Sequence, residues 1–214
     1  RLRGLKPPRY PGPFEGLVNA VPCQQMTLTF GLQLVARLAR AYGPRLPFLP
    51  ASEQGGPLGL PSPEALASAA PEALAAMGFS RAKARALIEL GAKVASGELD
   101  LRALEALPDE EAQRQLGKLF GVGRWTSEYV LLRALGRLNV FPDGDSGARN
   151  GLARFLGEAG KPTYAWVAER VAAWQPYAGF VYLHLLVDGA TRREGAAQAL
   201  GPGPSEPDLS GARS

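Results

Sequence analysis

Two glycines that flank Val122, Gly121 and Gly123, form the segment of this sequence with the clearest chemical potential. Glycine adopts backbone angles that are closed to other residues, so the chain can reverse tightly here between two helices. The free N–H groups and positive dipole end of the following helix would attract an anion such as a phosphate. A plain helix–helix turn has the same pattern. Apolar Leu119 and Val122, with Arg124 at the helix start, favour the phosphate-binding interpretation.

Two carboxylates follow this turn in the segment Phe141–Asp145, at Asp143 and Asp145. A carboxylate can stabilise positive charge that develops during a reaction, or it can help to activate water. An aspartate at the start of a helix is more often an N-cap, whose side chain accepts a hydrogen bond from the first helical turn. The residues alone leave both interpretations open.

Helices must position these residues, because Ala and Leu dominate the chain and strand-like alternation is hard to find. We therefore predict an all-α fold, with a Gly- and Pro-rich loop over 44–61 and a tail from about 192 whose composition predicts disorder. No repeat or linker divides the chain, so we expect one two-lobed domain over 1–191 and the tail over 192–214. The predicted helices cover residues 12–22, 26–42, 63–69, 71–77, 81–96, 101–106, 108–118, 125–137, 145–156, 162–174 and 177–190.

The composition excludes several classes of site. The 214 residues include one cysteine, Cys23, and one histidine, His184, which excludes an internal disulfide, a four-cysteine iron–sulfur cluster and a Cys- or His-based zinc site. We expect no protein-bound metal, and we expect His184 to be packed in the last helix. No apolar run is long enough to span a membrane, and the first residues lack the apolar stretch of a signal peptide. These features predict a cytoplasmic protein, and a net charge of +4 suits a polyanionic partner.

Residues 119–130, Leu-Phe-Gly-Val-Gly-Arg-Trp-Thr-Ser-Glu-Tyr-Val, and residues 140–145, Val-Phe-Pro-Asp-Gly-Asp, resemble the helix-hairpin-helix DNA glycosylase superfamily. The branch they are most similar to is the bacterial 3-methyladenine DNA glycosylase II (AlkA-like) type. The resemblance runs from Pro11 through Gln24 to His184, and it implies a two-lobed helical fold with the active-site cleft between the lobes. In that fold a Gly- and Pro-rich loop joins the hairpin motif to a catalytic aspartate. Longer members carry an N-terminal β-rich domain, which we expect to be absent because the chain begins too late to contain it.

The resemblance assigns the catalytic role to Asp145, which follows Gly123 by 22 positions and precedes the basic residue Arg149 by four. It leaves Asp143 in a loop or capping role. Bifunctional members attack the sugar with a lysine placed just after the hairpin, where this chain has Trp125. Since tryptophan cannot form a Schiff base, the resemblance implies a monofunctional enzyme that uses water.

Further site residues follow from the same resemblance. Trp125, Tyr129 and Tyr177 are the expected pocket for a flipped, positively charged base, although aromatic residues at helical spacing are usually core. Gln25 matches the intercalating position, and a surface glutamine near a helix start is the plain alternative. The residues expected to bind the DNA backbone are Phe120, Gly121, Val122, Gly123, Arg124 and Thr126. A monovalent cation that bridges hairpin carbonyls and a DNA phosphate is the one candidate cofactor.

Three functions remain open from the sequence. The first is a monomeric, monofunctional glycosylase that releases alkylated bases of the 3-methyladenine and 7-methylguanine type from duplex DNA. The second is a glycosylase of the same superfamily for another lesion or mismatch. The third is a DNA-binding module without catalysis, for which Asp145 would be dispensable.

Overall fold

The chain is helical throughout the part that the structure, a computed structural model, describes: residues 4–46 and 56–199, with only the backbone for 193–199. Within these residues one β-bridge, Arg45–Leu58, extends into no strand. The all-α prediction is therefore confirmed. The elements are α1 (Pro13–Cys23), α2 (Leu28–Tyr42), α3 (Pro63–Ala67), α4 (Pro71–Ala76), α5 (Arg81–Ala95), the 3-10 helix η1 (Arg102–Ala106), α6 (Asp109–Leu116), α7 (Arg124–Arg133), α8 (Ser146–Leu156), α9 (Tyr164–Val171), the 3-10 helix η2 (Ala172–Trp174) and α10 (Ala178–Ala199).

Side-chain caps fix where several helices begin. The hydroxyl oxygen of Thr27 accepts a hydrogen bond from the Phe30 N–H, so α2 begins at Leu28 rather than at 26. Ser80 accepts from the Lys83 N–H at 3.3 Å, as its position before α5 predicts. Proline occupies the first turn of α1, α3 and α4, where its missing N–H leaves no bond unmade.

Several helix predictions differ further from the structure. The helix predicted over 125–137 ends at Arg133, because Gly136 lies at φ +72°, which a continuing right-handed helix cannot use. Residues 102–106 and 172–174 form 3-10 rather than α-helix. The last helix runs to Ala199, so the predicted disorder from 192 is wrong for 192–199. The rest of the predicted tail, 200–214, lies outside the described residues.

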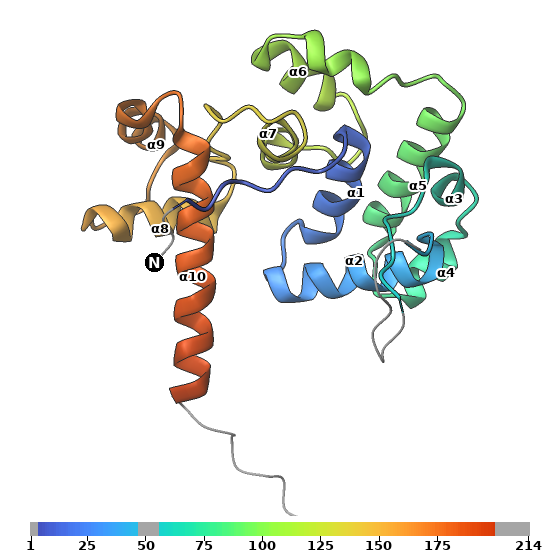
Figure 1. Ribbon diagram of the computed structural model, residues 1–214, viewed down its shortest axis with the longest axis horizontal. Coiled ribbons are helices and arrows are strands. Elements are labelled where there is room, and N and C mark those ends of the chain that lie inside the picture. Colours follow the sequence, from blue (N-terminus) through green and yellow to red (C-terminus); the bar gives the residue numbers. More distant parts are fainter. Residues whose placement is uncertain (1–3, 47–55, 200–214) are drawn as a thin grey trace, which may run out of the picture.

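The described residues form two buried apolar clusters, each in a group of helices that we call a lobe. The larger cluster takes residues from α1 to α7, with Leu17, Leu34 and Leu87 fully buried. The smaller one joins α7 to the helices that follow it, around Leu152 and Tyr182. Helix α7 contributes Leu131 to the first cluster and Leu132 to the second. Figure 1 shows α8, α9 and α10 gathered on one side of α7 and α1 to α6 on the other, so α7 is the element that the lobes share.

Candidate active site

Asp145 is the N-cap of α8 and is half-buried. Its Oδ1 accepts a hydrogen bond from the Ala148 N–H at 3.0 Å, which is the N-cap predicted as the plain alternative. Its Oδ2 accepts from the Tyr182 hydroxyl of α10 at 2.9 Å. Burial, followed by the nearby Asp145 carboxylate, holds the pKa of Tyr182 well above its usual range, so this phenol stays protonated and donates. Capping thus uses one carboxylate oxygen, and the other is held by a single phenol.

Trp125 lies against Gly144, the residue that precedes Asp145. A Cβ added to Gly144 would be 2.8 Å from the backbone N, Cα and Cβ of Trp125, so the loop rests directly on α7. The half-buried Trp125 ring lies 5.4 Å from the ring of Tyr129. The indole N–H is buried and makes no hydrogen bond of ordinary geometry, but it lies near the Tyr182 hydroxyl and opposes the rise in the pKa of that group. The Trp125 ring therefore adjoins both the loop that ends at Asp145 and the phenol that donates to Asp145.

Tyr129 itself is 8% exposed, and its hydroxyl is occupied. It donates to Asn19 Oδ1 at 3.1 Å, lies 3.1 Å from the Tyr10 hydroxyl and accepts from Arg133 at 3.3 Å. Burial raises its pKa far above the usual value. Tyr129 thus packs against Trp125, and little of its own ring is exposed to solvent.

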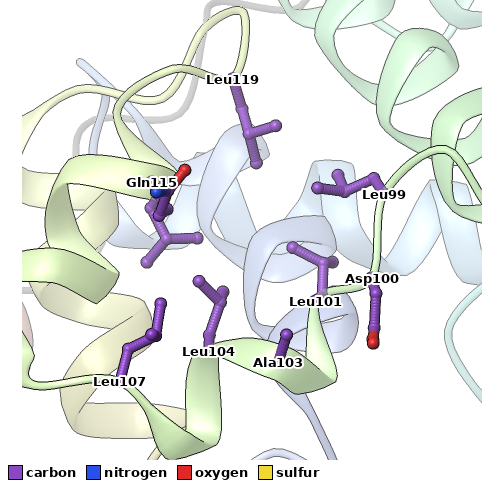
Figure 2. Close-up of a pocket in the computed structure, with 9 residues that line it drawn as sticks. Leu99, Asp100, Leu101, Ala103, Leu104, Leu107, Gln115 and Leu119 are labelled. Carbon is purple, nitrogen blue, oxygen red and sulfur yellow. The ribbon is translucent and has the colours of Figure 1, made fainter.

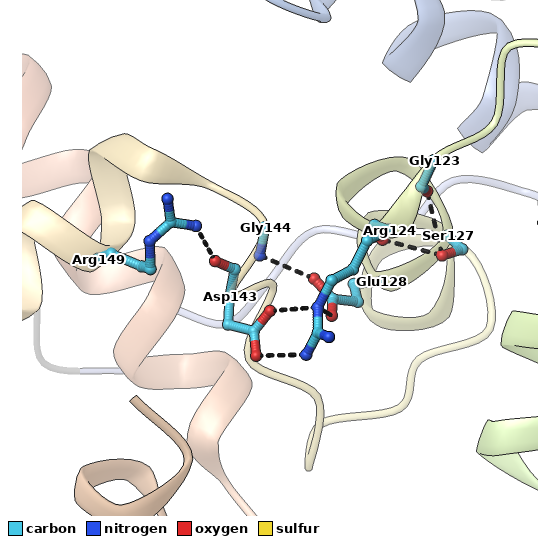
Figure 3. A network of polar contacts seen from close by, with 7 residues as sticks. All are labelled: Gly123, Arg124, Ser127, Glu128, Asp143, Gly144 and Arg149. Carbon is cyan, nitrogen blue, oxygen red and sulfur yellow. Dashed lines mark hydrogen bonds and ion pairs between the residues drawn. The ribbon is translucent and has the colours of Figure 1, made fainter. Parts of the chain in front are cut away.

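The segment before Asp145 is fixed by a polar network (Figure 3). Arg124 donates from Nε and Nη2 to the two carboxylate oxygens of Asp143, both at 2.6 Å, a bidentate pair. Arg124 Nε also lies 2.9 Å from Glu128 Oε1, one turn later on α7. From the other side, Arg149 donates to the backbone carbonyl of Asp143. Asp143 lies in the loop, as predicted, and its carboxylate anchors that loop to the helix that follows the hairpin.

Glu128 completes the network from within the protein. Its Oε2 accepts a hydrogen bond from the Gly144 N–H at 3.0 Å, and the residue is 5% exposed. Burial raises the pKa of Glu128 to about 7, with the Asp143 carboxylate adding to the shift and Arg124 opposing it. The amide next to Asp145 is therefore held by a carboxyl group that titrates near neutral pH.

The hairpin has the predicted geometry. Gly121 lies at φ +76°, and a Cβ there would be 2.9 Å from the Ala86 side chain, so both conformation and space require glycine. Gly123 is the exposed N-cap of α7, with open space around its Cα, and Val122 packs against the larger cluster. Phe120 is exposed, with the Arg85 guanidinium 4.0 Å from its ring centre. The start of α7 is accordingly open to an anion.

Two residues predicted to bind the DNA backbone have other partners through their side chains. The Arg124 guanidinium is engaged by the carboxylates of the polar network, and Thr126 is buried with its hydroxyl accepting from Gln24 Nε2 at 2.8 Å. Gln24 Nε2 also donates to the Gly121 carbonyl at 2.7 Å. The side chain of Gln24 thus ties the α1–α2 loop to the hairpin. Gln25, the predicted intercalating residue, is exposed in that loop at φ +54°.

Tyr177 stands apart from the other two predicted pocket residues. It is 60% exposed before α10, and among the described residues its ring pairs with Phe180, at 6.1 Å, rather than with Trp125. His184 is half-buried in α10. The structure thus brings Trp125, Tyr129 and Asp145 into one region, and it places Tyr177 at the surface.

Two cavities lie away from Asp145. The first, about 260 Å³, is apolar and is shown in Figure 2; it is lined by Leu99, Asp100, Leu101, Ala103, Leu104, Leu107, Gln115, Leu116 and Leu119. The second, about 380 Å³, is bordered by Glu128 and Asp143 together with residues of α6 and α9. Trp125 and Asp145 line neither cavity. In the described part of the chain we find no group of three metal-binding side chains and no helix long and apolar enough to cross a membrane.

Sequence reasoning missed three side chains that hold the site. Glu128 stands four residues after Arg124, a helical spacing that predicts an ion pair and could have drawn attention to it. Tyr182 contacts Asp145 from α10, and Lys83 donates to the Gln24 backbone carbonyl from α5 at 2.7 Å. Both come from helices distant in the sequence, and no local pattern identifies them.

Residues 18–176 match the family described as HhH-GPD superfamily base excision DNA repair protein. The chain belongs to this superfamily. This HhH-GPD chain is 32% identical over 184 residues to DNA-3-methyladenine glycosylase 2 of Escherichia coli, covering 85% of the chain and 60% of that protein. It superposes with a TM-score of 0.71 on the 3-methyladenine DNA glycosylase of Archaeoglobus fulgidus, at 29% identity, covering 82% of the chain and 57% of that structure.

A second solved relative is described as bound to DNA. The Schizosaccharomyces pombe 3-methyladenine DNA glycosylase in complex with abasic DNA superposes with a TM-score of 0.71 at 26% identity, covering 86% of the chain and 84% of that structure. The HhH-GPD chain spans 57 to 60% of the length of the first curated relatives that it matches. The predicted family and fold are confirmed by these matches.

Proposed function

We propose that this HhH-GPD protein is a monofunctional DNA glycosylase that releases alkylated bases from duplex DNA by hydrolysis. The observation that carries the proposal is Asp145, a half-buried carboxylate held by Tyr182 at 2.9 Å on a loop that rests on Trp125. Relatives named 3-methyladenine DNA glycosylases support the substrate class. The exposed hairpin at Gly121 and Gly123 would bind the DNA backbone. The partner would be a duplex that contains the damaged base.

The chemistry assigned to Asp145 is electrostatic. As the N-glycosidic bond breaks, positive charge grows on the deoxyribose ring, and an adjacent carboxylate lowers the energy of that state. A water oxygen then bonds to C1′ and loses a proton, while the bonding electrons leave with the base. An N3- or N7-alkylated purine carries a positive charge before cleavage and departs neutral, so it needs no protonation by the enzyme. The hydrogen bond from Tyr182 keeps one carboxylate oxygen in place throughout.

Selectivity for cationic bases follows from the aromatic surface at Trp125. The face of an indole ring attracts a cation by about 0.5–2 kcal/mol, which is enough to favour a charged base over a neutral one. The residue at the position just after the hairpin, where a lyase would have a lysine, is Trp125. A Schiff-base lyase step is therefore not part of the proposal.

The test is incubation of the protein with duplex DNA that carries methylated purines, followed by separate measurement of free base and of strand breaks. Base release without breaks before alkali treatment is the expected result. Breaks without alkali would point to a lyase, and DNA binding without release would point to a binding module. Release of a mismatched or oxidised base alone would favour another substrate of the superfamily.

Asp145→Asn is the decisive variant, with Asp188→Asn as its matched control. Asp188 lies in α10 and is paired with Arg192 at 2.6 Å, away from the loop that carries Asp145. We expect the Asp145 variant to lose base release by at least about a hundredfold, the scale seen when a group acting in the transition state is removed. Full base release by the Asp145 variant contradicts the assignment of the carboxylate.

A further inference from the structure

The backbone of Gln25 is held in an unfavourable conformation. Its φ of +54° makes it the one non-glycine residue with positive φ in the described part of the chain. A side chain in this left-handed region costs roughly 1–2 kcal/mol, so the conformation persists only where its surroundings impose it. The residue lies in the short loop between α1 and α2, and its own side chain is exposed. The contacts that impose the conformation must therefore come from its neighbours.

The strongest of these contacts come from Lys83, in the first turn of α5. Its ammonium donates to the backbone carbonyls of Pro22 at 2.9 Å and Gln24 at 2.7 Å, and it lies 3.6 Å from the Met26 sulfur. The three N–H bonds of the ammonium thus have three acceptors, and these acceptors lie on both sides of Gln25. Lys83 holds the loop from within the protein.

Lys83 is an unfavourable residue type for this position. The residue is 9% exposed, and burial lowers its pKa, with the neighbouring Cys23 acting in the opposite direction. Among the described residues no carboxylate pairs with it. A buried ammonium without a counter-charge depends on its hydrogen bonds, and here its acceptors belong to the loop around Gln25. An apolar side chain of similar length would fill the same space but would leave the carbonyls of Pro22 and Gln24 without this donor.

The same loop is fixed at two other points. The Gln24 side chain joins it to the hairpin, through the Gly121 carbonyl at 2.7 Å and the Thr126 hydroxyl at 2.8 Å. At the other side, Gly31 of α2 lies so close to Cys23 that an added Cβ would be 2.8 Å from its sulfur. The position of Gln25 is thereby linked to the hairpin turn, where the start of α7 is open to an anion.

We propose that Lys83 is a positioning residue that holds Gln25 in the conformation in which it enters the duplex after a base is flipped. The inference rests on the proposed function and on the intercalating role that the sequence predicts for Gln25. Lys83 draws the carbonyls of Pro22 and Gln24 inward, so these partial negative charges turn away from the DNA phosphates. Gln24 sets the distance between the wedge at Gln25 and the hairpin.

The test is Lys83→Met, with Lys93→Met as the matched control. Lys93 lies on the same helix, is half-buried with 44% of its side chain exposed, and pairs with Glu98 at 2.6 Å. The probe is a duplex with an abasic analogue opposite 2-aminopurine, whose fluorescence rises when a wedge unstacks it. We expect the Lys83 variant to lower the unstacking rate by about tenfold, the scale of a lost charge-assisted hydrogen bond, with affinity for undamaged duplex changed less than about twofold. Lys93→Met should match the unmodified protein.

A double-mutant cycle separates positioning from general destabilisation. If Lys83 acts through Gln25, then Lys83→Met should add nothing to the defect of Gln25→Ala, whereas independent effects would multiply. Lys83→Arg replaces the methionine variant if that protein does not fold; it keeps the charge but not the compact three-donor geometry, and we expect a defect of about threefold. A folded variant with a normal unstacking rate, or multiplicative defects in the cycle, overturns the inference.

The fluorescence measurement requires no base excision. A protein that releases no base but whose unstacking rate depends on Lys83 contradicts the proposed function and supports the positioning role. A protein that releases base normally while Lys83→Met unstacks at the normal rate supports the proposed function and overturns the positioning role.

Discussion

Gly144→Ala is the substitution that best tests how the loop before Asp145 is positioned. The added Cβ would stand 2.8 Å from three atoms of Trp125, two of which belong to the backbone of α7. Carbon atoms in contact are separated by about 3.5–4.0 Å, so the loop must retreat by roughly 1 Å. A misplacement of about 1 Å can lower a rate by about a hundredfold. We therefore expect a single-turnover rate of base release about a hundredfold lower, with release still detectable.

The assay is single-turnover release of methylated purines, read together with DNA affinity and the midpoint of thermal unfolding. Affinity should change little, because the hairpin at Gly121 and Gly123 is not touched by the substitution. Thermal stability should fall, since over-packing a well-filled contact costs about 1–3 kcal/mol. Gly189→Ala is the matched control: it lies in α10 with no atom within 4 Å of the added Cβ, and it should leave release unchanged.

A folded Gly144→Ala protein with normal turnover would refute this reasoning. It would mean that the loop can shift by about 1 Å without moving Asp145 relative to the sugar, or that Asp145 does not act on the sugar. The Asp145→Asn result distinguishes these two explanations.

Two further substitutions test the polar contacts of the site. Tyr182→Phe removes the hydrogen bond to Asp145 Oδ2, and we expect single-turnover release to fall about tenfold without a change in DNA affinity, as one lost hydrogen bond to a charged group predicts; a normal rate would mean that the capping bond alone holds the carboxylate. Glu128→Gln tests the buried carboxyl group, whose pKa of about 7 exceeds its ordinary value of 4.5. Because the folded state binds this proton more tightly, the favourable contribution is full below about pH 4.5 and is lost as pH rises through about 7. Urea unfolding of the unmodified protein should show a free energy that falls by up to about 1.4 kcal/mol per pH unit in this window, and the variant should lack that component; equal slopes for the two proteins would contradict the assignment to Glu128.

The sequence predicts most of the helices because their start signals are local. Ser80 caps the helix that follows it, as its type and position suggest. Thr163 caps α9, which begins at Tyr164 rather than at the predicted 162. Helix ends are predicted less well. Gly136 has a positive φ, so the helix cannot continue to the predicted end at 137. The Arg9 side chain packs over Gly136, and a Cβ added there would be only 2.9 Å from Arg9. That contact is made by the N-terminal segment, which no local pattern at 136 can reveal.

In the candidate site, too, the residues identified by local patterns can be predicted and those that make long-range contacts cannot. The hairpin and Asp145 lie within one stretch of chain, so spacing and family resemblance identify them. Tyr182 contacts Asp145 across 37 positions, and Lys83 contacts Gln24 across 59. Such partners depend on how helices distant in the sequence pack together. The roles given to Arg124 and Thr126 remain predictions, and their side chains hold the loop and Gln24 in the folded protein.

Helix α7 has no free face along its body, because seven consecutive residues, Thr126–Leu132, are buried between the two apolar clusters. Its N-terminus is exposed at the hairpin, while its body contacts both lobes. A change of lesion preference would therefore have to leave Thr126–Leu132 unchanged and to act at Trp125 or at residues outside this helix. Exposed residues outside α7, such as Tyr177, can be exchanged without repacking either apolar cluster. The buried body of α7 thus has little freedom to vary, whereas exposed residues outside the helix can vary without disturbing it.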